Sequence, residues 1–307
     1  MNEQIKLENN IPSFLKEMLE KQYDTKDIEK IVKGYYKKRP VTFRVNTIKA
    51  SVEKIKEELE KNDIQFDMVD FCEEAFIIKN VTEKEVEQLD IYKNGEIYLQ
   101  SLSSMLPPII LKPEENIDIL DMAAAPGGKT TQIAAITNNK SRITACEINN
   151  IRAERLKYNI DKQGATSVYL MKKDSRFIDD FFSFDKILLD APCSGSGTLD
   201  LNNQNSDKIF TKKLVDKSVK SQLSLLKKAV KVLKKGHEMV YSTCSILECE
   251  NEDIVNEVLK QYNVEIIPID YEWISKLPVL PTKINGTLCI APNEYFEGFF
   301  IAKLRKK

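Results

Sequence analysis

Residues 121–131 read D-M-A-A-A-P-G-G-K-T-T and directly follow the short apolar run at residues 117–120. The small residues and the two glycines of this stretch let the backbone approach a ligand closely, and a helix that begins here offers unpaired N–H groups. A P-loop requires a glycine where Ala123 stands, and the dinucleotide fingerprint G-x-G-x-x-G is missing. The stretch therefore predicts a turn from a strand into a helix at a ligand site that holds no pyrophosphate.

Carboxylates at the ends of later strand-like runs favour S-adenosylmethionine as this ligand. Glu147 ends the second run, twenty residues after Gly127, where an acidic side chain meets the ribose hydroxyls of an adenosine ligand. Asp174 ends the third run, placed to meet the adenine amine, and Asp190 ends the fourth. One carboxylate after a strand is often a helix cap, but three at successive strand ends are hard to obtain by chance. The expected cofactor-binding residues are Ala123, Ala124, Ala125, Pro126, Gly127, Gly128, Lys129, Glu147, Asp174 and Asp190.

From residue 96 onward, apolar runs alternate with longer amphipathic segments. The expected strands cover residues 117–121, 142–148, 168–171, 186–190, 238–242, 264–269 and 298–303. The expected helices cover residues 129–137, 151–163, 212–235 and 249–261. This alternation predicts an α/β fold with a doubly wound, seven-stranded, mostly parallel, Rossmann-like sheet. Ligands of such a sheet bind beyond the carboxyl ends of its strands.

The first 95 residues show a different pattern. Helical periodicity covers residues 11–20, 24–33 and 52–62, and short strand-like runs lie at residues 41–45 and 75–78. This predicts a small α/β module over residues 1–95, followed by a catalytic domain over residues 96–307.

The composition is that of a globular protein, with 42% apolar and 30% charged residues in a chain of 307. No apolar run approaches the roughly 20 residues of a membrane span, and the N-terminus shows no signal-peptide pattern. Six scattered cysteines without a C-x-x-C pair and a single histidine, His237, predict free thiols and no metal site. We therefore expect a cytoplasmic protein, most simply a monomer.

The net charge of −1 does not indicate a nucleic-acid binder, but the distribution of charge does. Residues 30–52 contain seven basic and no acidic side chains, with aromatic rings between them. This pattern suits RNA, and it equally suits a solvated helix end with core aromatics. Residues 212–235 carry nine lysines and one aspartate at helical spacing, on a face that is either solvent or ligand surface. The expected RNA contacts of the first run are Lys37, Lys38 and Arg39.

Two thiols follow neighbouring strands. Cys193 lies in D-A-P-C-S-G-S-G after the fourth expected strand, and Cys244 lies in Y-S-T-C-S after the fifth. Carbon 5 of cytosine is a poor nucleophile, but a thiolate that adds to carbon 6 makes an enamine whose carbon 5 can attack a methyl sulfonium. A carboxylic acid at ring N3, such as Asp190, stabilises the adduct. Position alone leaves the two thiols interchangeable.

Three stretches, D-M-A-A-A-P-G-G-K-T-T, D-A-P-C-S-G-S-G-T and S-T-C-S followed by E-N-E, resemble the motifs of the Sun-like RNA cytosine-5 methyltransferase family. The resemblance runs from about Arg39 to the C-terminus and includes R-P-V-T-F-R-V-N-T and L-Q-S-L-S-S-M-L-P. It implies Cys244 as the nucleophile and Cys193 as the thiol that helps to break the adduct. The resemblance further implies that Asp190 contacts the cytosine, that Lys129 holds cofactor and base, and that Arg44 and Asn46 face RNA.

This chain departs from the family pattern at Gln163, where relatives tend to carry a basic residue, and in Q-S-L-S-S, where they often have Q-D-x-S-S. Larger relatives add NusB-like or PUA-type domains, and we expect RNA capture here to rest on residues 1–95 and the basic surfaces. Three alternatives stay open. The first is a DNA cytosine-5 methyltransferase, although its Glu-Asn-Val motif has no clear counterpart in this chain. The second is an exocyclic-amine methyltransferase, although D-A-P-C lacks the second proline and the aromatic ring of that enzyme's motif. The third is a non-catalytic RNA-binding factor. Ribosomal and transfer RNA are both possible substrates.

Overall fold

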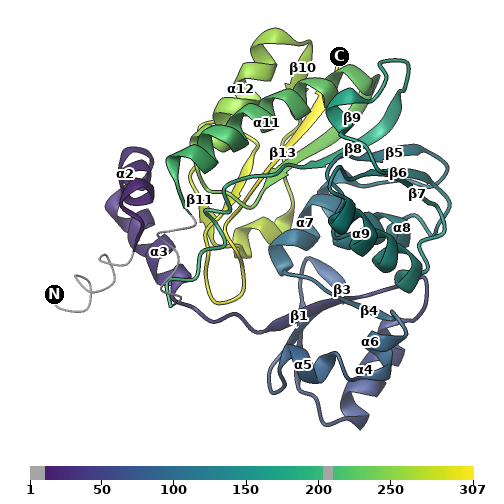
Figure 1. The fold of residues 1–307 in the computed structure, drawn as a ribbon. Coiled ribbons are helices and arrows are strands. Elements are labelled where there is room, and N and C mark those ends of the chain that lie inside the picture. Colours follow the sequence, from purple (N-terminus) through teal and green to yellow (C-terminus); the bar gives the residue numbers. More distant parts are fainter. Residues whose placement is uncertain (1–10, 203–209) are drawn as a thin grey trace.

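The computed structural model describes residues 11–202 and 210–307 and contains two sheets (Figure 1). The larger sheet has nine strands in the order β11-β12-β13-β9-β8-β5-β6-β7, and β10 pairs with β13 beside β12. Its strands are β5 (Asp118–Asp121), β6 (Arg142–Cys146), β7 (Val168–Met171), β8 (Phe184–Asp190), β9 (Leu233–Thr243), β10 (Val264–Ile266), β11 (Val279–Leu280), β12 (Leu288–Ile290) and β13 (Phe299–Lys306).

The predicted parallel-rich α/β sheet is confirmed. Strands β7, β6, β5, β8 and β9 are all parallel to their neighbours, and β13 returns antiparallel to β9. Each of the seven predicted runs forms a strand, and the short strands β11 and β12 extend the sheet to nine. With two and three residues, they are too short to show a strand period in the sequence.

Helices cover both faces of this sheet. Alternate residues of β8 separate the two cores: Leu188 joins the cluster under α7, α8 and α9, whereas Ile187 and Leu189 join the cluster under α2, α3, α11 and α12. The bounds of these helices are α2 (Ser13–Gln22), α3 (Thr25–Tyr35), α7 (Leu102–Leu111), α8 (Gly128–Ile136), α9 (Asn150–Gln163), α11 (Lys212–Val232) and α12 (Glu252–Gln261). Among the described helices, none combines the length and the apolar character that a membrane crossing requires.

The smaller sheet is antiparallel, with the order β2-β3-β1-β4. It packs on a core of its own, in which the rings of Phe43 and Phe76 stack at a centroid distance of 5.2 Å. The elements of this module are β1 (Val41–Val45), α4 (Val52–Lys61), β2 (Phe66–Val69), β3 (Cys72–Ile78), α5 (Glu83–Val86), α6 (Asp90–Lys93) and β4 (Ile97–Leu99).

The expected domain boundary at residue 95 stays a prediction, and two contacts bear on it. Strand β4 pairs with β1, so the smaller sheet extends to Leu99. Helices α2 and α3 bury Leu15, Leu19 and Ile31 in the core of the larger sheet, so they pack with the larger sheet and not with the smaller one. The short 3₁₀ helices η1 (Ser175–Phe177), η2 (Glu248–Glu250) and η3 (Glu272–Lys276) complete the described elements.

Candidate active site

The predicted cofactor residues gather at the carboxyl edge of the larger sheet. The chain turns from β5 into α8 at Gly127, whose φ of 111° is a conformation that favours glycine. Two hollows flank this turn, and Ala123 lines both. Of the predicted residues, Ala123, Ala124, Ala125, Pro126, Gly128, Lys129 and Asp190 line the first hollow, Ala123, Glu147 and Asp174 line the second, and Gly127 packs against Leu156 behind the turn.

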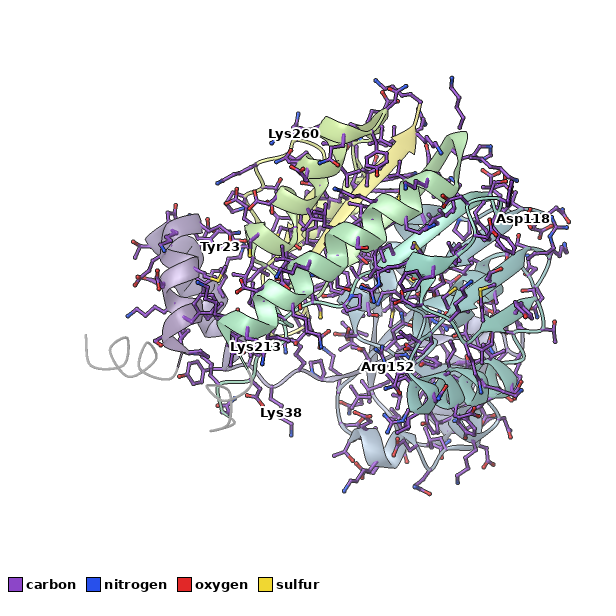
Figure 2. The ribbon with its side chains drawn as sticks, turned by 45° about the horizontal axis from the view of Figure 1, so that its top comes forward. Tyr23, Lys38, Asp118, Arg152, Lys213 and Lys260 are labelled. Carbon is purple, nitrogen blue, oxygen red and sulfur yellow. The ribbon has the colours of Figure 1, made fainter. Side chains whose placement is uncertain are left out.

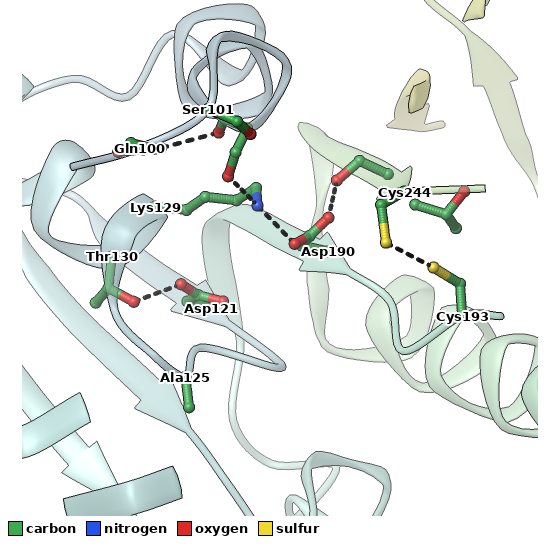
Figure 3. A network of polar contacts seen from close by, with 12 residues as sticks. Gln100, Ser101, Asp121, Ala125, Lys129, Thr130, Asp190, Cys193 and Cys244 are labelled. Atoms are coloured by element: carbon green, nitrogen blue, oxygen red, sulfur yellow. Dashed lines mark hydrogen bonds and ion pairs between the residues drawn. The ribbon is translucent and has the colours of Figure 1, made fainter. Parts of the chain in front are cut away.

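A lysine–carboxylate pair lies in the first hollow (Figure 3). The Nζ of Lys129, in the first turn of α8, donates to Asp190 Oδ2 at 2.6 Å and to Ser104 Oγ at 2.7 Å. The other oxygen of Asp190 accepts from Ser242 Oγ at 2.8 Å. Helices α7 and α8 and the ends of strands β8 and β9 therefore fix this pair from different directions, as a binding group with a defined orientation requires.

A second carboxylate of the first hollow was not assigned a role from the sequence. Asp121 ends β5 and is 1% exposed, and its Oδ2 accepts from Thr130 Oγ1 at 2.7 Å. Its Oδ1 is buried and has no hydrogen-bond partner within the described part of the chain. Burial raises the pKa of Asp121 to about 6. A buried acceptor without a donor, on the wall of a hollow, is suited to a ligand that brings the donor.

The second hollow contains the two carboxylates expected at the adenosine. Glu147 is 4% exposed, and its Oε1 accepts from the backbone N–H of Asn149 at 2.8 Å, while Arg152 lies 3.6 Å from Oε2. Asp174 pairs with Arg176 at 2.5 Å, and this hydrogen-bonded pair lowers the pKa of Asp174. The sequence did not point to either arginine, because nothing in the spacing indicates that they fold back onto the carboxylates.

The two predicted thiols meet. Cys193 follows β8 and Cys244 follows β9, and because β8 and β9 pair in parallel, their Sγ atoms lie 3.1 Å apart (Figure 3). Both are free and half-buried. The hydrogen bond with Cys244, followed by burial, raises the pKa of the Cys193 thiol well above its ordinary value. The backbone N–H of Gly197 donates to the carbonyl of Cys244 at 3.0 Å, which ties the two loops together.

The predicted RNA residues divide into two groups. Lys37 and Lys38 are exposed, and Arg39 is half-buried with its Nε on the carbonyl of Phe296 at 2.9 Å. Arg44 and Asn46 are 2% and 0% exposed. The prediction that these two side chains face RNA is wrong, because both point into the molecule, as their contacts show.

Arg44 and Asn46 join the smaller sheet to the larger domain. Arg44 donates to Gln100 Oε1 at 3.0 Å, to Thr131 Oγ1 at 2.7 Å and to the carbonyl of Gly128 at 3.1 Å. Asn46 Nδ2 donates to the carbonyls of Gly95 and Gln163 at 2.8 and 2.7 Å. The β1 strand thus holds the first turn of α8 and the last turn of α9.

The two departures from the family pattern also have partners inside the chain. Gln163 is 1% exposed and donates to the carbonyl of Ile97 at 3.1 Å. Ser101, within the Q-S-L-S-S stretch, donates to Glu297 Oε2 at 2.8 Å. Both positions therefore stabilise the junction between the modules in this chain.

A parallel-rich sheet with a small-residue turn after its first strand defines a Rossmann-like methyltransferase. Residues 108–305 match the model of the family described as 16S rRNA methyltransferase RsmB/F, and residues 11–83 match that of the RsmF/B-like ferredoxin-like domain. The chain belongs to the RsmB/F family, and the resemblance to Sun-like enzymes is confirmed.

Several relatives and solved structures are similar to this chain. Ribosomal RNA small subunit methyltransferase F of Shewanella piezotolerans is 35% identical over 88% of this chain, which spans only 59% of that relative. The probable ribosomal RNA small subunit methyltransferase B of Bacillus subtilis is 31% identical, with 98% of this chain and 67% of the relative covered. The structure of NSun6 from Pyrococcus horikoshii with SFG has a TM-score of 0.84 at 25% identity, covering 97% of this chain and 98% of that one.

Proposed function

We propose that this protein transfers a methyl group from S-adenosylmethionine to carbon 5 of a cytosine in RNA, and that the RNA is ribosomal. The observation that carries this proposal is the pair of thiols 3.1 Å apart, beside the Lys129–Asp190 pair, at the carboxyl edge of the sheet. Membership of the RsmB/F family and relatives named ribosomal RNA small subunit methyltransferases support it. The expectations of a monomer, of the cytoplasm and of a site without metal stay predictions.

The residues at the two hollows fit S-adenosylmethionine, which supplies an electrophilic methyl on its sulfonium. Glu147 and Asp174 offer acceptors to the ribose and the adenine in the second hollow. The unpartnered Oδ1 of Asp121 offers an acceptor to the cofactor's ammonium in the first hollow. A Cβ at Gly128 would lie 3.1 Å from the ring of Tyr98 on the wall of the first hollow, a tight contact to which the ring would have to yield. The binding of SFG by the P. horikoshii neighbour supports this assignment.

The chain's own residues then divide the work on the base. The Cys244 thiolate forms a bond to carbon 6, and the electron pair of the C5–C6 double bond moves so that carbon 5 can take the methyl group. Asp190, held by Lys129 and Ser242, acts here as the carboxylic acid: it donates a hydrogen bond to ring N3 and so stabilises the negative charge that develops on the ring. A solvent water takes the proton from carbon 5, the C–H electron pair restores the C5–C6 double bond, and the C6–S bond breaks with its electron pair on sulfur. The departing Cys244 sulfur takes a proton from the Cys193 thiol, which solvent then reprotonates.

RNA capture is assigned to the first 95 residues and to the exposed start of α11. Figure 2 shows Lys38 and Lys213 on the same side of the molecule, and Asn202, in the chain before α11, donates to the carbonyl of Tyr36 at 3.2 Å. This basic surface can neutralise RNA phosphates while the base enters the first hollow. Its exposed members are Lys37, Lys38, Lys212, Lys213, Lys217 and Lys220.

The test is methyl transfer from labelled S-adenosylmethionine to transcripts of small-subunit ribosomal RNA, followed by digestion and mass spectrometry of the nucleosides. We expect 5-methylcytidine in the ribosomal transcript and little in transfer RNA or in DNA duplexes. Label on an exocyclic amine, or methylation of DNA alone, would replace the proposal by the corresponding alternative. RNA binding without any methyl transfer would indicate a binding factor.

A further inference from the structure

A fully buried carboxylate lies behind the two thiols. Glu250 ends η2 and is 0% exposed. Its Oε1 accepts from the backbone N–H of Ser194 at 2.8 Å and from Gln222 Nε2 at 3.3 Å. Its Oε2 accepts from Ser194 Oγ at 2.5 Å and from Ser245 Oγ at 2.6 Å. Each of these four contacts supplies a donor, so both carboxylate oxygens of Glu250 are used as acceptors.

The two serines on Glu250 are the sequence neighbours of the two thiols. Ser194 follows Cys193, and Ser245 follows Cys244. One carboxylate therefore links the loop after β8 to the loop after β9. A serine pair supports the link from the other side, because the Oγ atoms of Ser196 and Ser245 lie 2.8 Å apart.

Glu250 is joined more closely to the Cys193 loop than to the Cys244 loop, through two contacts to Ser194 against one to Ser245. Its negative charge adds to the effects of Cys244 and of burial, which together raise the pKa of Cys193. The other titratable groups close by are Tyr241, whose hydroxyl donates to the carbonyl of Glu250 at 2.6 Å, and Asp190 at the end of β8. A nearby negative charge opposes the formation of a thiolate, so it keeps a proton on the thiol it faces.

We propose that Glu250 is a positioning residue that holds the Cys193 and Cys244 loops at one separation and places its carboxylate directly behind Cys193, so that the two thiols differ in reactivity. Position in the sequence left the two cysteines interchangeable, and Glu250 provides a physical reason for their difference. The inference rests on the proposed function for the roles of the thiols in methyl transfer, but not for the difference in their ionisation.

The test is alkylation by iodoacetamide between pH 6 and 10, with mass spectrometry of the two cysteine peptides. It needs neither RNA nor cofactor, so its result is independent of whether the chain methylates RNA. In the wild type, we expect Cys244 to react faster. Glu250→Gln removes the charge and keeps the side-chain size. In this variant we expect the Cys244-to-Cys193 rate ratio at pH 8 to fall by about 5-fold or more, because one nearby charge changes the pKa of a thiol by about one unit or more. The matched control is Glu248→Gln, which removes an adjacent carboxylate paired with Lys283.

An unchanged ratio in folded Glu250→Gln, or an equal change in Glu248→Gln, would overturn the proposal. If circular dichroism shows that Glu250→Gln does not fold, Ser194→Ala serves instead, because it keeps the charge and removes one contact to the Cys193 loop. Because that variant keeps the charge and loosens the Cys193 loop, a changed Cys244-to-Cys193 rate ratio supports the link, and an unchanged ratio refutes it. In methyl-transfer assays, Glu250→Gln is expected to lower kcat and to leave KM for RNA unchanged.

Discussion

The two sheets use their buried polar side chains in opposite ways. On the smaller sheet, Arg44 and Asn46 donate to carbonyls and side chains of the larger domain, although Arg44 Nη1 has no partner among the described residues. On the larger sheet, Asp121 keeps an oxygen without a partner among the described residues, and two thiols meet at the strand ends. Three donated hydrogen bonds make Arg44 a link between the two sheets, whereas the open carboxylate oxygen of Asp121, at a strand end among the predicted cofactor residues, is available to a ligand.

The two sheets also depend on each other. Arg44 is a buried cation held by neutral acceptors, and burial lowers its pKa to about 10. The face of Tyr98 lies 5.2 Å from its guanidinium. This costly arrangement fixes Gly128 and Thr131, in the first turn of the helix that carries Lys129. The smaller sheet therefore positions the first turn of α8, and with it Lys129, at the carboxyl edge of the larger sheet.

The largest expected effect separates the two thiols. Cys244→Ala should lower methyl transfer by at least about 10³-fold and abolish the covalent adduct with RNA that contains 5-fluorocytosine, because it removes the nucleophile. Cys193→Ala should instead let an adduct with unmodified RNA accumulate, since release is slowed. Denaturing gels of protein with labelled RNA measure both. The opposite pattern, with the adduct lost only in Cys193→Ala, would exchange the two roles.

The second effect tests Arg44 as a structural link. Arg44→Met should lower the free energy of unfolding by about 4 kcal/mol, because three buried acceptors lose their donor. Arg142→Met is the matched control, since Arg142 is 83% exposed in its pair with Asp118, and it should cost less than about 0.5 kcal/mol. Urea denaturation measures both. Equal losses in the two variants would remove the contrast between the buried link and a surface pair.

The third effect is a pH dependence that belongs to Asp121. The pKa of this carboxyl is about 6 in the folded chain and near its ordinary 3.8 after unfolding. Between these values the folded chain holds a proton that the unfolded chain has lost, so the free energy of unfolding falls as pH rises through this window. The 2.2-unit difference corresponds to about 3 kcal/mol.

Asp121→Asn should flatten that pH dependence. Chemical denaturation of both proteins at pH 4 and pH 7 measures the difference between the two conditions. If the free energy of unfolding depended on pH in the same way in both proteins, Asp121 would not be the group responsible. Its unpartnered Oδ1 would then be as well solvated as the oxygen of a surface carboxylate.

The sequence predicted those helices and strands that bury a single face, because their apolar residues then recur with a regular period. Strand β7 and strand β1 have the predicted bounds, and the thiols lie together as the order of parallel strands requires. The helix expected to run to residue 235 ends at Val232, and Leu233 is already the first residue of β9. The prediction ran too far because Leu233 continues the apolar pattern of the helix. The helical period therefore could not show where the chain becomes extended.

The interior positions of Arg44 and Asn46 could not be predicted in this way. A basic run with aromatic neighbours has the same composition whether it faces RNA or a second domain. Burial of Arg44 follows from contacts with Gln100 and Thr131, more than fifty residues away along the chain. Likewise, nothing in E-N-E indicates that Glu250 reaches both serines beside the thiols. These are tertiary contacts, which local patterns do not encode.

The smallest effect concerns the exposed part of the same basic run. Lys37→Ala/Lys38→Ala should weaken binding to single-stranded RNA about 5-fold, or about 1 kcal/mol, and lower the slope of log K against log salt by about 1.5, because two phosphate contacts are lost. Lys140→Ala/Lys260→Ala is the control, since these exposed lysines lie outside both the first 95 residues and α11. Fluorescence anisotropy over a salt series measures both. If both double variants lost the same affinity, RNA binding would depend on net charge alone. The surface formed by Lys37, Lys38 and the start of α11 would then have no specific role in RNA capture.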